Sequence, residues 1–278
     1  MRVNVLKSSG FCGGVTRALY LLDKTIKENK DRTIYLLGDI VHNDTVNEKY
    51  KKLGVKVISK DELDSLKDGE IVLSSAHGIS DKMREKLSRF NHIDTTCPFV
   101  RKNQNRIKSD PQKEIIFIGK KKHAETVAMT EDNENIWIIE SEDELNFFNS
   151  FNEGSVYNQT TFNSIKLNKI YEELGKRAQK YDIYNTMCET MKNLQDSLKT
   201  VDPRYNVCVI VGDKKSSNAN SLVEMSPYIR THFIENEMEV DKIGLCKLDS
   251  VLIVGSASTP KDLLERVKNK IKEKFPKN

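Results

Sequence analysis

Hydrophobic residues along the chain gather in short β-branched runs, separated by longer amphipathic segments. The runs predict strands at residues 2–6, 33–37, 55–58, 71–74, 114–118, 136–139, 155–158, 182–184, 206–211, 231–234 and 250–254. Apolar positions three and four residues apart predict helices between many of them, for example at 15–28, 81–90, 100–108, 163–180, 218–229 and 260–274. Regular alternation of strand and helix is typical of an α/β fold with mostly parallel sheets.

Polar side chains of chemical interest lie where these runs end. In parallel sheets, ligands bind in the loops at the carboxyl ends of the strands. Such loops contain the following residues: Cys12, His42, His77, Cys97, His123, Glu125, Gln159, Thr160, Thr161, Ser216, Ser217, Asn218 and Ser258. So many polar residues at equivalent strand ends predict one shared central site, reached from several lobes.

Three of the five cysteines, Cys12, Cys97 and Cys188, are almost evenly spaced, and each precedes a segment with helical character. Their spacing and the strand–helix pattern predict three small α/β lobes, at residues 1–96, 97–187 and 188–278, with one of these cysteines in each. A helix N-terminus favours the thiolate, which is the metal-binding form. Three thiolates suit an iron–sulfur cluster or a zinc site and leave a position for a substrate. Spacing alone also allows ordinary thiols.

Composition limits the class of protein and the cellular compartment in which this chemistry is expected. Charged residues make up 31% of the 278-residue chain and hydrophobic ones 37%, and the net charge of +4 gives no argument for nucleic-acid binding. We see no secretory signal and no run long enough to span a membrane, so we expect a cytoplasmic protein. The odd number of distant cysteines argues against a disulfide framework. Cys208 and Cys246, in or near strand patterns, are expected to be small core residues.

Histidines and hydroxyl residues point to an anionic ligand. His42, His77 and His123 lie in equivalent loops, where they could ligate a metal or donate to an anion. Residues 216–218 (Ser-Ser-Asn) and Ser258 precede helices, where they could cap the helix or cradle a phosphate. A multiply charged anion such as a diphosphate fits this set. No GxxxxGK[ST] motif occurs, so a nucleotide is not the first expectation. Glu125 and Thr160 could relay a proton.

Taken together, these residues resemble the 4-hydroxy-3-methylbut-2-enyl diphosphate reductase family, also called LytB or IspH, of the non-mevalonate isoprenoid pathway. The resemblance spans nearly the whole chain and rests on an ordered set of motifs: GFCGGV, VHN, SAHG, DTTCP, KHAET, QTT, SSNAN and SASTP. No single motif is decisive, but the ordered set is specific. It implies an oxidoreductase with three α/β lobes in a pseudo-threefold arrangement around a central [4Fe–4S] cluster.

The resemblance also implies roles for individual residues. Cys12, Cys97 and Cys188 would ligate the cluster, whose fourth iron binds the oxygen of the substrate. Glu125 would deliver protons and Thr160 would hydrogen-bond near the substrate hydroxyl. The diphosphate would be held by His42, His77, His123, Ser216, Ser217, Asn218 and Ser258. The reaction is reductive dehydroxylation to isopentenyl and dimethylallyl diphosphates, with electrons from ferredoxin or flavodoxin.

One segment departs from the family pattern. After the third cysteine the family has Cys-x-Ala-Thr-x-x-Arg-Gln, whereas this chain reads CETMKNLQ. Met191 stands for the threonine and Leu194 for the arginine, while Gln195 is kept. The departure puts the support of Cys188 in doubt. It motivates an alternative reading, a non-catalytic iron–sulfur or zinc module that senses redox state.

Overall fold

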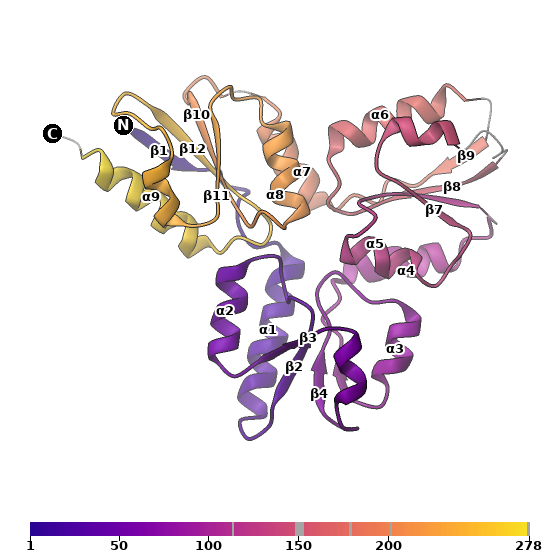
Figure 1. Ribbon diagram of the computed structural model, residues 1–278. Coiled ribbons are helices and arrows are strands. Elements are labelled where there is room, and N and C mark those ends of the chain that lie inside the picture. Colours follow the sequence, from indigo (N-terminus) through magenta and orange to yellow (C-terminus); the bar gives the residue numbers. More distant parts are fainter. Residues whose placement is uncertain (113, 148–152, 178–179, 201, 277–278) are drawn as a thin grey trace. The chain divides into compact units, whose positions relative to one another are not determined.

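The structure, a computed structural model, describes residues 1–112, 114–147, 153–177, 180–200 and 202–276. Within these ranges the strands form three four-stranded sheets, and every pairing of neighbouring strands is parallel. Figure 1 shows each sheet with its flanking helices. The α/β fold with three lobes and parallel sheets, expected from the sequence, is confirmed.

The first sheet and its helices come from residues between 13 and 93. Its strands are β3, β2, β4 and β5 in spatial order, which span Lys56–Ile58, Ile34–Leu37, Ile71–Leu73 and Asn91–Ile93. The helices of this stretch are α1 (Gly13–Glu28), α2 (Asp44–Lys52), a 3-10 helix (Asp61–Ser65) and α3 (Asp81–Leu87).

The second sheet has the same plan in the middle of the chain. Its strands in spatial order are β7, β6, β8 and β9, which span Ile136–Ile139, Ile115–Ile118, Glu153–Asn158 and Lys180–Ile183. The helices of this stretch are α4 (Pro98–Lys108), α5 (Ala124–Thr130), a 3-10 helix (Glu142–Phe147) and α6 (Ser164–Gly175).

The third sheet combines the two ends of the chain. Its strands in spatial order are β11, β10, β12 and β1, which span Thr231–Ile234, Val207–Val211, Ser250–Gly255 and Arg2–Val5. The helices of this stretch are α7 (Glu189–Leu198), α8 (Ser217–Met225), a 3-10 helix (Glu237–Lys242) and α9 (Lys261–Lys274).

All three sheets share one strand order. If the strands β2–β5, β6–β9 and β10–β12 are each counted along the chain, the spatial order is second, first, third, fourth. In the third sheet, the place of the fourth strand is taken by β1, which pairs with β12. The expected first lobe, 1–96, therefore does not keep its first strand in its own sheet. Strand Arg2–Val5, expected in the first lobe, therefore belongs to the third sheet. The lobe boundaries near 97 and 188 stay a prediction.

The chain divides into two compact units. Unit 1 consists of Met1–Cys12, His42–Val46 and Glu189–Asn278, and it holds the third sheet. Unit 2 consists of Gly13–Val41 and Asn47–Cys188, and it holds the other two sheets. The candidate site residues are distributed over both units.

Most predicted strands and helices agree with the structure to within a few residues. Strand β5 was missed, and the helix predicted at 163–180 ends at Gly175; residues 178–179 lie outside the described ranges. The helix predicted at 218–229 ends at Met225 because Pro227 follows and Ser226 is extended (ψ 123°). Cys208 is buried as expected, but Cys246 is exposed, so that prediction was wrong.

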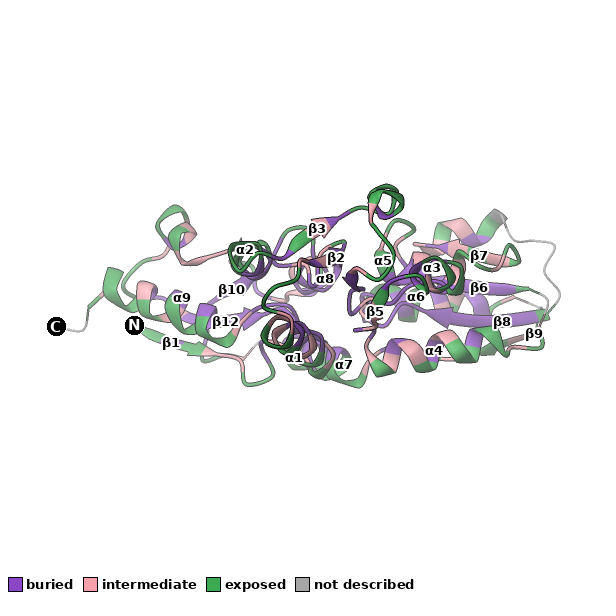
Figure 2. Ribbon diagram, turned by 90° about the horizontal axis from the view of Figure 1, so that it is seen from below, coloured by how far each residue is buried: buried purple, intermediate pink, exposed green. Residues whose placement is uncertain are grey.

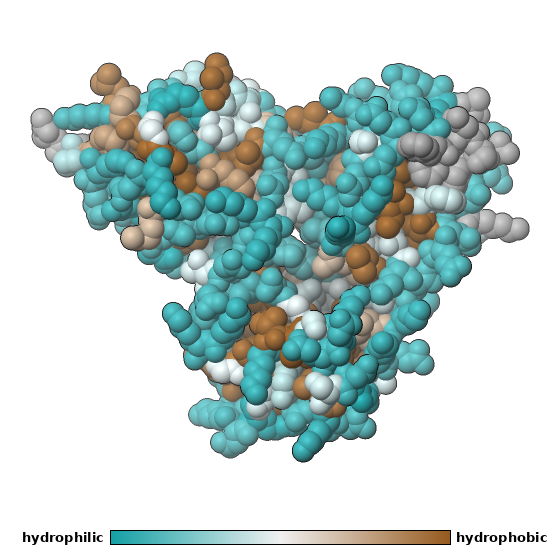
Figure 3. Space-filling view, in the orientation of Figure 1, coloured by the Kyte–Doolittle hydropathy of each residue, from teal (hydrophilic) through white to brown (hydrophobic). Residues whose placement is uncertain are grey.

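Each sheet carries its own hydrophobic core. The core of the third sheet joins β10 and β12 to the inner face of α9, through residues that include Val209, Ile253 and Val267. Figure 2 shows β6 and β8 buried along most of their length, as expected for strands covered on both faces. Figure 3 shows a face covered largely by hydrophilic residues. No helix in the described part of the chain is long and apolar enough to cross a membrane.

Candidate active site

The three evenly spaced cysteines occupy equivalent positions in the fold. Cys97 follows β5, Cys188 follows β9 and Cys12 follows β1, and each of these is the fourth strand of its sheet. The near-even spacing along the sequence thus reflects a structural repeat. In this arrangement Cys97 belongs to the sheet formed by residues 34–93.

The same backbone hydrogen bond recurs at all three cysteines. The Cys12 N–H donates to the Ala257 carbonyl (3.1 Å), the Cys97 N–H to the Ala76 carbonyl (3.0 Å) and the Cys188 N–H to the Thr160 carbonyl (3.0 Å). Each acceptor lies in the loop after the third strand of its sheet. Ala257 directly precedes Ser258 and Ala76 directly precedes His77. Every candidate metal ligand is therefore fixed to a loop that carries a candidate substrate-binding residue.

The cysteines differ in chemical setting. Cys12, Cys97 and Cys188 are not in disulfides and are half-buried, and each lies directly before a helix; Cys97 is the N-cap of α4. Cys208 is fully buried, and burial raises the pKa of its thiol to about 12, against a hydrogen bond with Ser226 that lowers it. The three accessible thiols before helices are the donors that a soft metal or an iron–sulfur cluster takes.

Glu125 and Thr160 meet in unit 2. The Glu125 side chain is 1% exposed, and its carboxylate accepts the Thr160 N–H (2.6 Å at Oε1) and the Thr160 hydroxyl (2.7 Å at Oε2). Burial raises the pKa of Glu125 from 4.5 to about 7, although the two bonds from Thr160 lower it. A carboxyl group with a pKa near neutrality can both hold and release a proton at physiological pH.

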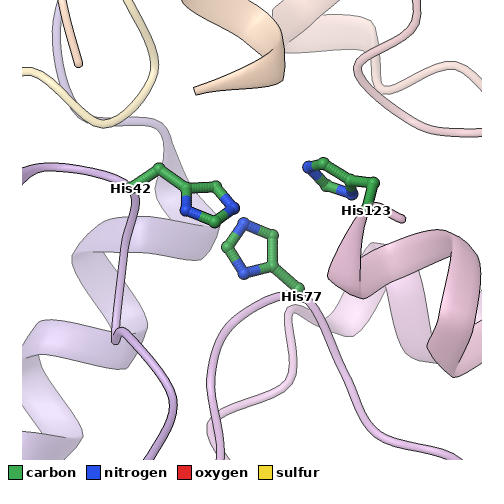
Figure 4. Close-up of side chains that lie close together, drawn as sticks. All are labelled: His42, His77 and His123. Carbon is green, nitrogen blue, oxygen red and sulfur yellow. The ribbon is translucent and has the colours of Figure 1, made fainter. Parts of the chain in front are cut away.

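His77 and His123 also lie together in unit 2. Their rings meet edge to face with 5.2 Å between centroids (Figure 4). His123 is the N-cap of α5, and its Nδ1 accepts the Glu125 N–H at 3.2 Å. A neutral ring that accepts at Nδ1 carries its proton on Nε2, so this nitrogen can donate to a ligand. His77 Nδ1 lies 3.3 Å from the Ser75 hydroxyl.

The loop before α8 forms a polar cradle in unit 1. Ser216 is the N-cap of α8, and its hydroxyl accepts the Ala219 N–H at 3.3 Å. Asn218, on the first turn, is 5% exposed, yet neither polar atom of its side chain has a hydrogen-bond partner within the described residues. A buried amide without a partner is costly, which indicates a ligand at this helix N-terminus.

Gly212 allows this cradle to approach the sheet. A Cβ atom at Gly212 would lie 2.8 Å from the Ala219 Cβ and 2.9 Å from the Ser256 Oγ. Any side chain at this position would therefore push the first turn of α8 away from the end of β10. The absence of a side chain at Gly212 thus allows the first turn of α8 to lie close to the end of β10.

His42 and Ser258 belong to the same unit as the cradle. The Ser258 hydroxyl donates to the His42 carbonyl at 2.9 Å. His42 (labelled in Figure 4) follows β2 in the chain, and its backbone is held by the loop after β12. Unit 1 thus gathers Cys12, His42, Ser216, Ser217, Asn218 and Ser258, and unit 2 gathers Cys97, Cys188, His77, His123, Glu125 and Thr160.

The segment that departs from the expected pattern forms the buried face of α7. Met191 is 2% exposed, Leu194 1% and Gln195 0%. Helices α7 and α8 pack against each other. The two apolar replacements therefore fill protein interior, where a hydrocarbon side chain is favoured.

Comparisons with known proteins agree with this geometry. A family model described as "LytB protein" matches residues 3–272. A 4-hydroxy-3-methylbut-2-enyl diphosphate reductase of Caldanaerobacter subterraneus is 31% identical over 98% of this chain and 97% of its own length. A protein of the same name from Pelobacter propionicus is 29% identical over the full length of both chains.

Two solved structures are similar as well. One is the E-1-hydroxy-2-methyl-but-2-enyl-4-diphosphate reductase from Plasmodium falciparum, with a TM-score of 0.88, 26% identity, and coverage of 98% of this chain and 88% of that one. The other is described as (E)-4-hydroxy-3-methyl-but-2-enyl diphosphate reductase, the terminal enzyme of the non-mevalonate pathway. It has a TM-score of 0.68 and 27% identity, and 98% of this chain and all of that one are covered.

Proposed function

Because the chain belongs to the LytB protein family, we propose that it is an oxidoreductase that reduces 4-hydroxy-3-methylbut-2-enyl diphosphate to isopentenyl and dimethylallyl diphosphates. The allylic C–O bond breaks, two electrons and two protons are consumed, and water leaves. The observation that carries the proposal is the buried Glu125–Thr160 pair, hydrogen-bonded through Thr160 to Cys188. An acid with a pKa of about 7 is thus linked through one residue, Thr160, to the backbone of a candidate metal ligand.

Substrate binding falls to the histidine, hydroxyl and amide residues. In unit 1, the N-terminus of α8 offers N–H groups, the Ser216 and Ser217 hydroxyls and the buried Asn218 amide to a diphosphate, together with Ser258 and His42. In unit 2, His77 and His123 offer imidazole N–H groups to a diphosphate. Helix N-termini and imidazole N–H groups are suited to a ligand with two or three negative charges.

The donor set fits an iron–sulfur cluster. Cys12, Cys97 and Cys188 would hold a [4Fe–4S] cluster through three thiolates. When bound, such a cluster supplies the electrons and a Lewis-acidic iron that has no protein ligand and polarises the allylic oxygen. Cys208 is excluded from this role by burial and by its raised pKa.

Glu125 holds the proton that the leaving oxygen needs. Enclosure by protein keeps the group protonated at neutral pH for a substantial part of the time. Thr160 orients the carboxyl through two hydrogen bonds, and its hydroxyl lies within reach of a group bound next to Glu125. Electrons arrive one at a time from a carrier of the ferredoxin or flavodoxin class.

The sequence argument for the alternative function, a non-catalytic redox sensor, is weakened by the structure. It rested on Met191 and Leu194, and both side chains are buried on the core face of α7. These two apolar side chains serve packing, and the buried Glu125, with its pKa raised to about 7, favours a catalytic role over a passive metal module.

The test is anaerobic purification and cluster reconstitution, followed by absorption and paramagnetic resonance spectra. Turnover is then measured with the hydroxymethylbutenyl diphosphate and a one-electron donor. We expect a brown, oxygen-sensitive protein that forms both products. A colourless, iron-free protein that cannot be reconstituted would contradict the cluster, and a loaded protein without turnover would favour the sensor.

A further inference from the structure

Asp213 is an acidic residue in the middle of the proposed anion cradle. It follows β10 and Gly212, three residues before Ser216, and it is 4% exposed. Its Oδ1 accepts the Lys215 N–H at 2.7 Å, and its own carbonyl accepts the Ser216 N–H at 2.9 Å. These bonds fix the turn that delivers Ser216, Ser217 and Asn218.

The second carboxylate oxygen of Asp213 reaches a segment far away in the sequence. Its Oδ2 accepts the backbone N–H of Asp44 at 3.1 Å. Asp44 is the first residue of α2 and lies two residues after His42. One buried carboxylate thus binds the backbone of both loops that carry proposed diphosphate ligands in unit 1.

The contact does not depend on the surface charges beside it. It joins the buried Asp213 carboxylate to a partly buried backbone N–H, and an ionised acceptor makes a stronger hydrogen bond than a neutral amide. The Asp44 side chain makes an ion pair with Lys215 (3.3 Å), but both side chains are about two-thirds exposed, and such pairs contribute little. The backbone bond is therefore the link that holds the loops together.

We propose that Asp213 is a positioning residue for the diphosphate: it sets the separation between the His42 loop and the N-terminus of α8. The inference rests on the proposed function, since it assumes that both loops bind one diphosphate. We assign Asp213 no contact with the ligand, because each of its carboxylate oxygens already accepts a backbone N–H and an ionised carboxylate has no proton to donate to a diphosphate.

The hydrogen bond can be removed from either side. Asp213→Asn leaves one acceptor for two N–H groups. Asp44→Pro removes the donor at the first position of a helix, where proline is tolerated. We expect each variant to weaken binding of inorganic diphosphate, measured by calorimetry on the cluster-loaded protein, by about tenfold. In turnover assays KM should rise more than kcat falls.

Asp44→Asn is the matched control, because it removes the exposed ion pair and keeps the N–H; we expect its affinity to stay within about twofold of the wild type. The double variant Asp213→Asn, Asp44→Pro should bind diphosphate as tightly as the single variant of lower affinity, because both substitutions remove the same hydrogen bond. Additive losses, unchanged affinity in either single variant, or a tenfold loss in Asp44→Asn would overturn the proposal. A wild-type protein that binds no diphosphate would instead overturn the proposed function.

Discussion

Glu125 owes its chemical character to its enclosure rather than to a neighbouring charge. Burial is the largest cause of its raised pKa, and the two hydrogen bonds from Thr160 act in the opposite direction. At the sequence level it is one glutamate among many, and the exposed Glu134 in the turn after the same helix is of the ordinary kind. The comparison of these two residues gives the first prediction.

We predict that Glu125→Gln reduces turnover by at least about a hundredfold, because the amide has no acidic proton to give. The cluster should still form, since no cysteine is altered; iron content and the absorption spectrum check this. Glu134→Gln is the matched control and should keep wild-type turnover. Turnover of Glu125→Gln close to that of the wild type would reject the role of this residue as proton donor.

We also predict a pH-dependent difference in stability between the wild type and Glu125→Gln. A folded-state pKa raised from 4.5 to about 7 means that the contribution of Glu125 is fully present below pH 4.5 and is lost as pH rises through 7. The loss should amount to roughly 3 kcal/mol. Melting temperatures from pH 4 to 8 should show the wild type falling relative to the variant; a constant difference would contradict the raised pKa.

At the scale of elements, Gln104 joins the two lobes of unit 2. From α4 its amide nitrogen donates to the Ile79 carbonyl in the loop after His77 and to the Ala128 carbonyl in α5, both at 2.9 Å. Helix α5 begins directly after His123. Gln104 therefore ties together the loop and the helix that present the two histidines, whose rings are in edge-to-face contact.

Gln104→Ala should destabilise the protein by about 1–3 kcal/mol, since two part-buried carbonyls lose their donor. It should also raise KM, because the separation of His77 and His123 is no longer fixed. Urea unfolding and steady-state kinetics measure the two effects. The exposed neighbour Asn105 on the same helix provides the control: Asn105→Ala should change neither quantity. Equal effects of the two substitutions would reject the bridging role.

Local patterns in the sequence were sufficient to predict most elements but not their partners. The run at 91–93 (Asn-His-Ile) is too short and polar to predict a strand, so β5 was missed. No local pattern reveals that β1 pairs with β12, because that choice depends on the third sheet lacking a fourth strand of its own. The bonds made by Asp213 and Gln104 were likewise unpredictable, since both are contacts to distant backbone atoms.

At the scale of the whole molecule, three sheets of one strand order place one cysteine at the same structural position in each. The candidate site residues could be proposed from the sequence because they lie in loops that follow strands. This position does not depend on which sheet each strand joins. The predicted lobe boundaries at 97 and 188 are a separate question. Strand β1 does not follow them, because it belongs to the third sheet.

Equivalence of the three positions predicts equivalent effects of substitution. Cys12→Ser, Cys97→Ser and Cys188→Ser should each lower iron content and abolish turnover, because each removes one of three thiolates. Cys246→Ser is the control, since this cysteine is exposed and lies outside the equivalent set; it should retain both. Iron and sulfide analysis after reconstitution measures the effect. A fully loaded Cys188→Ser protein would exclude Cys188 as a ligand.

The repeated bond from each cysteine N–H to a neighbouring loop has a thermodynamic consequence. Because each cysteine shares a backbone hydrogen bond with the loop beside it, we expect ligation of the thiol and ordering of that loop to favour each other. Coupling free energies are reciprocal: if the loaded cluster strengthens diphosphate binding, then bound diphosphate strengthens retention of the cluster by the same factor. We therefore expect a reconstituted protein to lose iron more slowly when diphosphate is bound than when it is absent.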